Sequence, residues 1–149
     1  MKTVFDPSTR NELIGRIRSI SANSRRNWGK MNVYQMARHC TIWDEWVQGT
    51  QPEVYRQDFL GKIFGRWALK SNTRNEKPLP KNTPTGKRFT VKDQGDVEKQ
   101  KLRWIEGVQA YGHFSNPSFI HDFFGKMTEE QIGIFAYKHA DHHLRQFGA

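Results

Sequence analysis

The sequence predicts an all-α protein with four main helices, one short helix and a long connection between the second and third main helices. Apolar residues recur every three or four positions in five segments, which is the spacing of amphipathic helices. No segment shows the sustained alternation of a strand. Residues 71–92 lack periodicity and hold three of the six prolines, which is typical of a crossover. The length of 149 residues suits one domain, which we expect to span residues 1–149.

The first two main helices have clear start signals. Asp6 can cap free backbone N–H groups, and Pro7 suits the first helical position. The apolar positions that follow are Leu13, Ile14, Ile17 and Ile20. Asn32 and Gln35 form a capping-box pattern, which predicts a second helix over residues 32–48.

The remaining helices follow a similar logic. A short helical piece is expected where one stripe carries Phe59, Leu60, Ile63, Phe64 and Trp67. Asp93 or Asp96 caps the third main helix, for which Gly112 is a plausible stop. Its expected buried residues are Val97, Trp104, Ile105, Val108 and Tyr111. Thr128 and Gln131 form another capping box, which opens the last helix and predicts that it runs to about residue 146.

The charge of +9 is concentrated in one segment. Residues 62–92 hold nine basic residues and one acid, Glu76. We interpret the segment as a solvated connector in preference to a phosphate-binding patch, because no familiar nucleic-acid motif accompanies it. We therefore expect neither a nucleic-acid partner nor a membrane partner, since no apolar stretch reaches the length of a transmembrane helix and none opens the chain as a signal peptide. The single cysteine, Cys40, favours a reducing, cytoplasmic location.

Three histidines lie on helix faces that must turn inward. His139 and His143 are about 40° apart on a helix at roughly 100° per residue, and they share their arc with Phe135. His39 shares its arc with Trp43 and other apolar residues. Inward imidazoles are costly to bury unless their nitrogens are satisfied. A divalent metal would do so, and three protein ligands with open positions are typical of a catalytic site.

A purely structural role remains an alternative interpretation for each of these residues. A single inward histidine is more often a hydrogen-bonded core residue than a ligand. His142 lies on the flank and suits a supporting or partly exposed position, while His121 could reach the site from its loop. Cys40 fits a buried apolar thiol better than a nucleophile. Trp43 belongs to the core by default, or could wall a pocket above a metal together with Trp46.

Two stretches of the sequence resemble the DinB/YfiT-like superfamily. They are residues 137–148, YKHADHHLRQFG, and residues 31–40, MNVYQMARHC. More narrowly, residues 121–126, HDFFGK, resemble a subfamily loop that reads His-Pro-Phe-Phe-Gly-Lys, with Asp122 in place of proline. Residues 78–85 also resemble that subfamily, so the resemblance covers essentially the whole chain. The departure at Asp122 leaves the histidines intact and concerns the shape of the pocket mouth.

The resemblance implies a four-helix bundle with up-down-down-up topology. It implies a metal site of His39, His139 and His143, which holds nickel, zinc or iron, and it implies a homodimer. Relatives that have been characterised are metal-dependent transferases or isomerases using low-molecular-weight thiols such as bacillithiol, mycothiol or glutathione.

We therefore predict a metal-dependent enzyme, most simply a thiol transferase acting on small electrophiles. The two metal-facing arcs carry no carboxylate and the sequence lacks His-Glu-x-x-His, which disfavours water activation relative to thiol activation. His121 and His142 are candidates for substrate contact. The alternatives are a metal-dependent hydrolase, a non-enzymatic ligand-binding bundle, and a nucleic-acid binder that uses residues 62–92.

Overall fold

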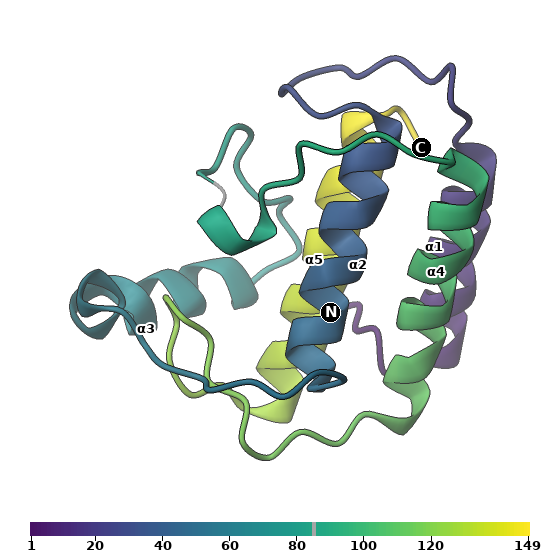
Figure 1. Cartoon of the computed structure of the whole chain (residues 1–149). Helices are drawn as coiled ribbons and strands as arrows, with labels where there is room; N and C mark the ends of the chain where they lie inside the picture. The colour runs from purple at the N-terminus through teal and green to yellow at the C-terminus, as the bar shows by residue number, and fades with distance from the viewer. Residues whose placement is uncertain (85) are drawn as a thin grey trace.

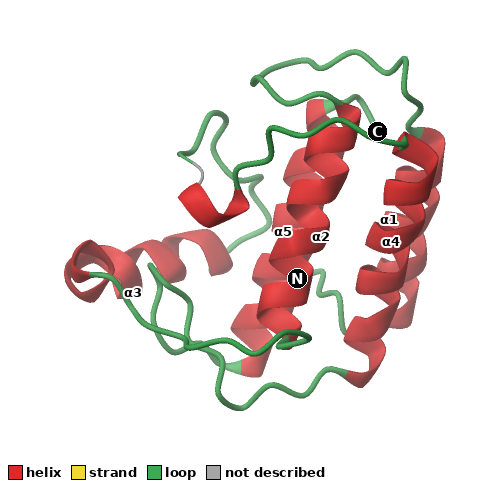
Figure 2. Cartoon of the chain, viewed as in Figure 1, coloured by secondary structure: helices red, strands yellow, loops and turns green. Residues whose placement is uncertain are grey.

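The computed structural model describes residues 1–84 and 86–149, and their regular structure is entirely helical. The helices are α1 (Pro7–Ser19), α2 (Val33–Gln48), α3 (Phe59–Thr73), α4 (Val97–Ala110) and α5 (Glu129–Gln146). Two 3-10 turns are η1 (Lys87–Phe89) and η2 (Tyr111–His113). No strand occurs in the part of the chain described (Figure 2), where a single isolated bridge joins His121 and Gly125. The predicted all-α class is therefore confirmed.

The start signals in the sequence are those that the helices use. The Asp6 side chain accepts from the Ser8 backbone N–H at the start of α1. Complete capping boxes open α2, through Asn32 and Gln35, and α5, through Thr128 and Gln131. Asp96 caps α4, so Asp93 is excluded as the cap. These contacts are local, which is why the sequence predicts them well.

Four helices lie side by side, and α3 lies across them at the edge (Figure 1). α2 contacts α4 and α5, and α1 contacts the same two helices. In Figure 1, α1 and α5 run in one direction, and α2 and α4 run in the other. Because α2 and α4 are parallel neighbours, the chain needs a long crossover between them, and residues 49–96 supply it. None of the described helices is both long and apolar enough to cross a bilayer.

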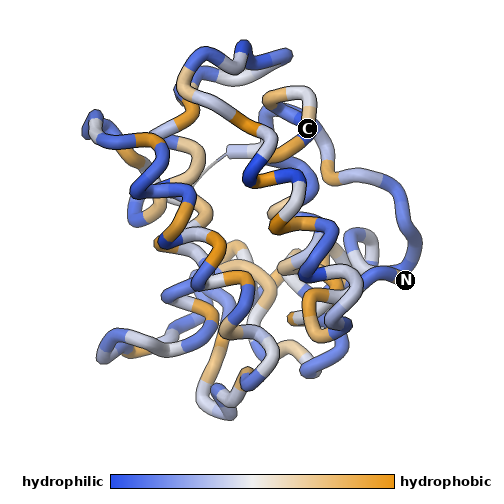
Figure 3. Tube along the Cα trace, turned by 90° about the vertical axis from the view of Figure 1, so that its right-hand side faces the viewer, coloured by the Kyte–Doolittle hydropathy of each residue, from blue (hydrophilic) through white to orange (hydrophobic). Residues whose placement is uncertain are grey.

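The core lies between the four helices that run side by side. Hydrophobic and hydrophilic residues alternate along the helical turns (Figure 3), and the apolar positions face inward. The fully buried side chains include Leu13, Ile17, Met36, Val47, Trp104, Val108 and Leu144. This packing fixes how α2 and α5 are rotated about their axes, so it also fixes where their inward histidines point.

The structure differs from the sequence prediction at three points. α3 is a helix of 15 residues, not a short piece, and its apolar stripe faces outward. α4 ends at Ala110 in a 3-10 turn that contains Gly112, so this glycine is no left-handed cap. Val97 is only partly buried. Helical periodicity shows that a stripe exists but not whether another element covers it.

Candidate metal centre

His39 on α2 is held in place by a backbone carbonyl from the crossover. Its Nδ1 lies 2.8 Å from the Phe89 carbonyl oxygen, so Nδ1–H donates to that oxygen. The Phe89 carbonyl belongs to η1, so this hydrogen bond ties the crossover to the site. In the neutral ring the lone pair then lies on Nε2, which points away from Phe89. Burial lowers the pKa of His39, which keeps the ring neutral.

His143 on α5 has a similar arrangement. Its Nδ1 lies 3.1 Å from Gln146 Oε1, and Gln146 Nε2 donates to the Trp28 carbonyl oxygen at 2.8 Å. The second bond fixes which end of the amide faces the ring, so Nδ1–H donates to Gln146 and Nε2 keeps its lone pair. Burial, and next to it the nearby His39, lower the pKa of His143 well below its ordinary value.

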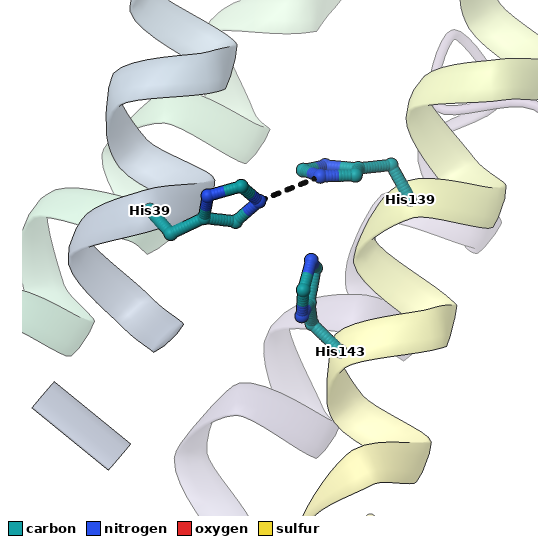
Figure 4. Close-up of side chains that lie close together, drawn as sticks. All are labelled: His39, His139 and His143. Atoms are coloured by element: carbon teal, nitrogen blue, oxygen red, sulfur yellow. Dashed lines mark hydrogen bonds between the residues drawn. The ribbon is translucent and has the colours of Figure 1, made fainter. Parts of the chain in front are cut away.

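The three rings converge on one point between α2 and α5 (Figure 4). His39 Nε2 and His139 Nε2 are 3.1 Å apart, and one nitrogen from each of His39, His139 and His143 lies within 4.8 Å of the others. Burial, and next to it the nearby His143, lower the pKa of His139 well below its ordinary value. Burial therefore favours the neutral form of all three rings, and a nitrogen of each ring lies at a common space.

This donor set fits a divalent transition metal. Zinc–nitrogen bonds of about 2.0–2.1 Å place the nitrogens of a tetrahedral site roughly 3.3 Å apart, and neutral imidazole also suits nickel, iron and copper. The distance of 3.1 Å between His39 Nε2 and His139 Nε2 is close to that spacing. A nitrogen of His143 lies within 4.8 Å of both rings' ligand atoms. Two of the rings are already oriented through their other nitrogen, as metal-binding histidines usually are. The described cluster contains no carboxylate.

Aromatic rings form a wall beside the cluster. The Trp43 ring lies 4.4 Å from the His139 ring, centroid to centroid, and 5.9 Å from the Phe135 ring. Trp46 packs against Phe89 at 5.2 Å. These contacts put both tryptophans in the core, and Trp43 also touches a candidate ligand. An apolar wall limits water at the cluster and is typical of small-molecule sites.

His121 packs against two of these aromatic residues and is not part of the histidine cluster. Its ring is 5.2 Å from the Trp46 ring and 6.0 Å from the Phe135 ring. Its Nδ1 lies 3.1 and 3.3 Å from the backbone nitrogens of Phe123 and Phe124 and 3.0 Å from Asp122 Oδ1. His121 therefore belongs to the polar contacts of its own loop, and it does not share the point where the other three rings meet.

His142 faces a different space. Its ring is 5.1 Å from the His143 ring and 5.7 Å from the Trp28 ring. It lines a surface pocket of about 350 Å³ together with Trp28, Leu79 and Lys81. His142 is half-buried, and burial lowers its pKa. His142 therefore lies next to His143, a candidate ligand, but faces the pocket. This is the flank of the helix where the sequence placed it.

Cys40 is a buried thiol, as predicted. It is 1% exposed, and burial raises its pKa well above the ordinary value. A thiol held protonated in the core is a poor nucleophile. The sequence-based choice of an apolar role over a nucleophilic role is consistent with both observations.

Sequence reasoning missed two groups that orient the rings. Gln146 appears on the inward arc of the last helix, three residues after His143, and this spacing could have marked it as a hydrogen-bond partner. The Phe89 carbonyl is a backbone group from a segment without periodicity. No sequence signal identifies it, because any residue carries a carbonyl.

Fold and site together define an all-helical protein with a three-histidine cluster that could bind a metal ion. A family profile described as "Protein of unknown function (DUF1569)" matches residues 6–149. The chain therefore belongs to the DUF1569 family. No curated protein and no solved structure matches it.

Proposed function

We propose that this protein is a metal-dependent enzyme whose ligands are His39, His139 and His143. The observation that supports this most strongly is the orientation of the rings. His39 and His143 each donate Nδ1–H to a protein acceptor. Nε2 of each ring therefore remains available at the cluster. Metal-binding histidines are usually oriented in this way through their other ring nitrogen, and here two of the three rings are.

We further propose that the four helices lying side by side form a four-helix bundle of the DinB/YfiT-like kind. The run directions of the helices in Figure 1 and the position of the cluster between α2 and α5 support this. The proposed bundle is a homodimer, as the resemblance of residues 31–40 and 137–148 implies.

The proposed reaction is transfer of a low-molecular-weight thiol to a small electrophile. A bound divalent ion supplies Lewis-acid chemistry and lowers the pKa of a thiol that it coordinates. The cluster holds three imidazoles and no carboxylate, so it lacks the carboxylate base with which a hydrolase would activate water. The Trp43 wall excludes water on one side of His139. The His121 ring and the pocket at His142 are the candidate contacts for substrate.

Elemental analysis of the purified protein, before and after reconstitution with nickel, zinc or iron, tests the site. We expect about one ion per chain. Absence of bound metal after reconstitution contradicts the proposal.

A thiol-consumption screen with several electrophiles then tests the reaction in the metal-loaded protein. Thiol-dependent loss of electrophile supports the transferase. Hydrolysis of esters or amides without added thiol would identify a metal-dependent hydrolase in its place. Metal binding with neither activity would favour a ligand-binding bundle.

A further inference from the structure

The outer face of α3 is a large apolar surface. Five side chains on it are between 54% and 76% exposed: Phe59, Leu60, Ile63, Phe64 and Trp67. Together they expose roughly 600 Å² of apolar area, which is at the upper end of what a monomer usually presents in one patch. Figure 1 shows α3 at the edge of the molecule, where it contacts α5.

The orientation of α3 is fixed by its opposite face. Gly61 and Gly65 lie against the Phe123 backbone so closely that a Cβ at either would meet the Phe123 carbonyl oxygen at 2.3 or 2.1 Å. Leu69 and Thr73 continue this buried face. The small residues therefore face the protein and the large apolar residues face outward. A rotation of α3 that buried the aromatic residues would lose this close approach.

Basic residues accompany the apolar face. Lys62, Arg66 and Lys70 are exposed on α3, and the helix contains no acidic residue. The segment that follows α3 carries further exposed basic residues, among them Arg74 and Lys77, whereas Arg88 is paired with Glu53 and Lys81 lies over Trp28. An exposed helix with aromatic and aliphatic residues on one face and lysine or arginine at its side has the composition of an interfacial amphipathic helix.

We propose that α3 docks this protein on an anionic lipid surface. The outward side chains of Phe59, Phe64 and Trp67 would enter the headgroup boundary, and the basic residues would pair with lipid phosphates and carboxylates. This proposal departs from the expectation of no membrane partner, which considered only spanning and signal segments, because surface attachment needs neither. This proposal does not depend on the metal site.

Charge favours a lipid surface over a second copy of the chain. A face-to-face pair of α3 helices would bring Lys62, Arg66 and Lys70 of both copies together without one acidic residue from either helix. Like charges facing each other across an interface oppose association. An anionic bilayer would bury the same apolar face and neutralise the same positive charges.

Co-sedimentation of the full chain with vesicles tests the proposal. We expect binding to phosphatidylcholine vesicles that contain phosphatidylserine, weak binding to phosphatidylcholine alone, and a decrease with added salt. Ile63→Glu with Trp67→Glu should abolish binding, whereas Leu102→Glu, at an exposed leucine of α4, should leave it unchanged. Lys62→Gln with Lys70→Gln should weaken binding by about tenfold or more. The matched control is Lys99→Gln with Arg103→Gln on α4, which removes the same number of exposed charges.

Tryptophan fluorescence reports which face is inserted. Trp67 is 75% exposed, and the other four tryptophans are buried or half-buried. Anionic vesicles should shift the emission to the blue, and Trp67→Phe should remove that shift while binding persists. Failure of the wild type to bind anionic vesicles overturns the proposal. So does a monomer–dimer equilibrium that the α3 variants abolish in the absence of lipid, which would assign the face to a second copy.

Discussion

His39 and His139 face each other with their Nε2 atoms 3.1 Å apart, although they are separated by 100 positions in the chain. The Phe89 carbonyl oxygen accepts a hydrogen bond from Nδ1–H of His39. The Nε2 lone pair of His39 therefore faces His139. Either His139 donates its own proton to that lone pair, or both nitrogens bind the cation that we propose. The His143 ring lies beside both rings and would supply the third ligand of that cation.

Removing a candidate ligand should remove the metal. We expect His139→Ala and His143→Ala each to lower the metal content of the purified protein to near zero, because two imidazoles hold a divalent ion far less tightly than three. Elemental analysis measures the content. His142→Ala is the matched control, since its ring faces the pocket at Trp28. Equal metal content in all three variants would contradict the assignment.

Gln146 should act as a positioning residue for His143. Gln146→Leu removes the acceptor of Nδ1–H and should weaken metal binding by roughly 10–100-fold. Gln146→Glu keeps an acceptor oxygen there but loses the bond to the Trp28 carbonyl, so it should restore most of the affinity. Titration against a competing chelator measures both. Equal affinity loss in the two variants would show that only the bond to Trp28 matters.

Asp44 should make stability depend on pH. Its carboxyl is buried, Oδ1 accepts from the Tyr111 hydroxyl at 2.9 Å, and burial raises the pKa of Asp44 to about 8. Between about pH 4 and about pH 8 the folded protein holds a proton that the unfolded chain has released, so this group lowers stability as the pH rises.

Asp44→Asn should remove this dependence. We expect the variant to exceed the wild type in stability by roughly 1–3 kcal/mol near pH 8 and to lose that advantage progressively as the pH falls towards 4. Denaturant unfolding at both pH values checks this. The exposed Asp93→Asn is the control, and a constant difference between Asp44→Asn and wild type at all pH values would disprove the titration of Asp44.

Asp141 should stabilise the contact between α1 and α5 without touching the cluster. Its carboxylate is buried and pairs with Arg16 at 2.9 Å and with Arg145 at 2.7 Å. Asp141→Ala should cost about 1–3 kcal/mol of unfolding free energy, because Arg16 is left without this partner in a largely buried position.

Metal content should not change in Asp141→Ala, although Asp141 lies between His139 and His142 in the sequence. Glu12→Ala is the control, since Glu12 forms exposed pairs that contribute little. Thermal unfolding together with elemental analysis separates the two effects. Loss of metal at normal stability would show that Asp141 serves the cluster directly.

Sequence patterns predicted the parts of the site that depend on helical geometry. His139 and His143 are one turn apart, so any helix through them points both to one side, and Phe135 shows that this side is apolar. The same argument turns His39 inward with Met36 and Trp43. Whether the two arcs would meet could not be derived in this way, because periodicity gives the direction of a face and not its distance from another face.

α3 illustrates the limit of the same reasoning. Its apolar stripe is as regular as those of α2 and α5, but the structure leaves it uncovered. Gly61 and Gly65 decide this, because only glycine permits the approach to the Phe123 backbone. A sequence pattern weights large apolar residues and gives no weight to glycine, so it identifies the wrong face as the one that packs.

The four main helices, the starts of α1, α2 and α5 and the inward direction of three histidines were determined by the sequence alone, because capping and helical periodicity act over a few residues. The tertiary structure decided which faces meet, which carbonyl orients His39 and which surface of α3 is exposed. Those outcomes depend on contacts between residues far apart in the chain, such as His39 with Phe89 and Gly65 with Phe123. Long-range contacts arise from the packing of whole elements, and no local pattern records them.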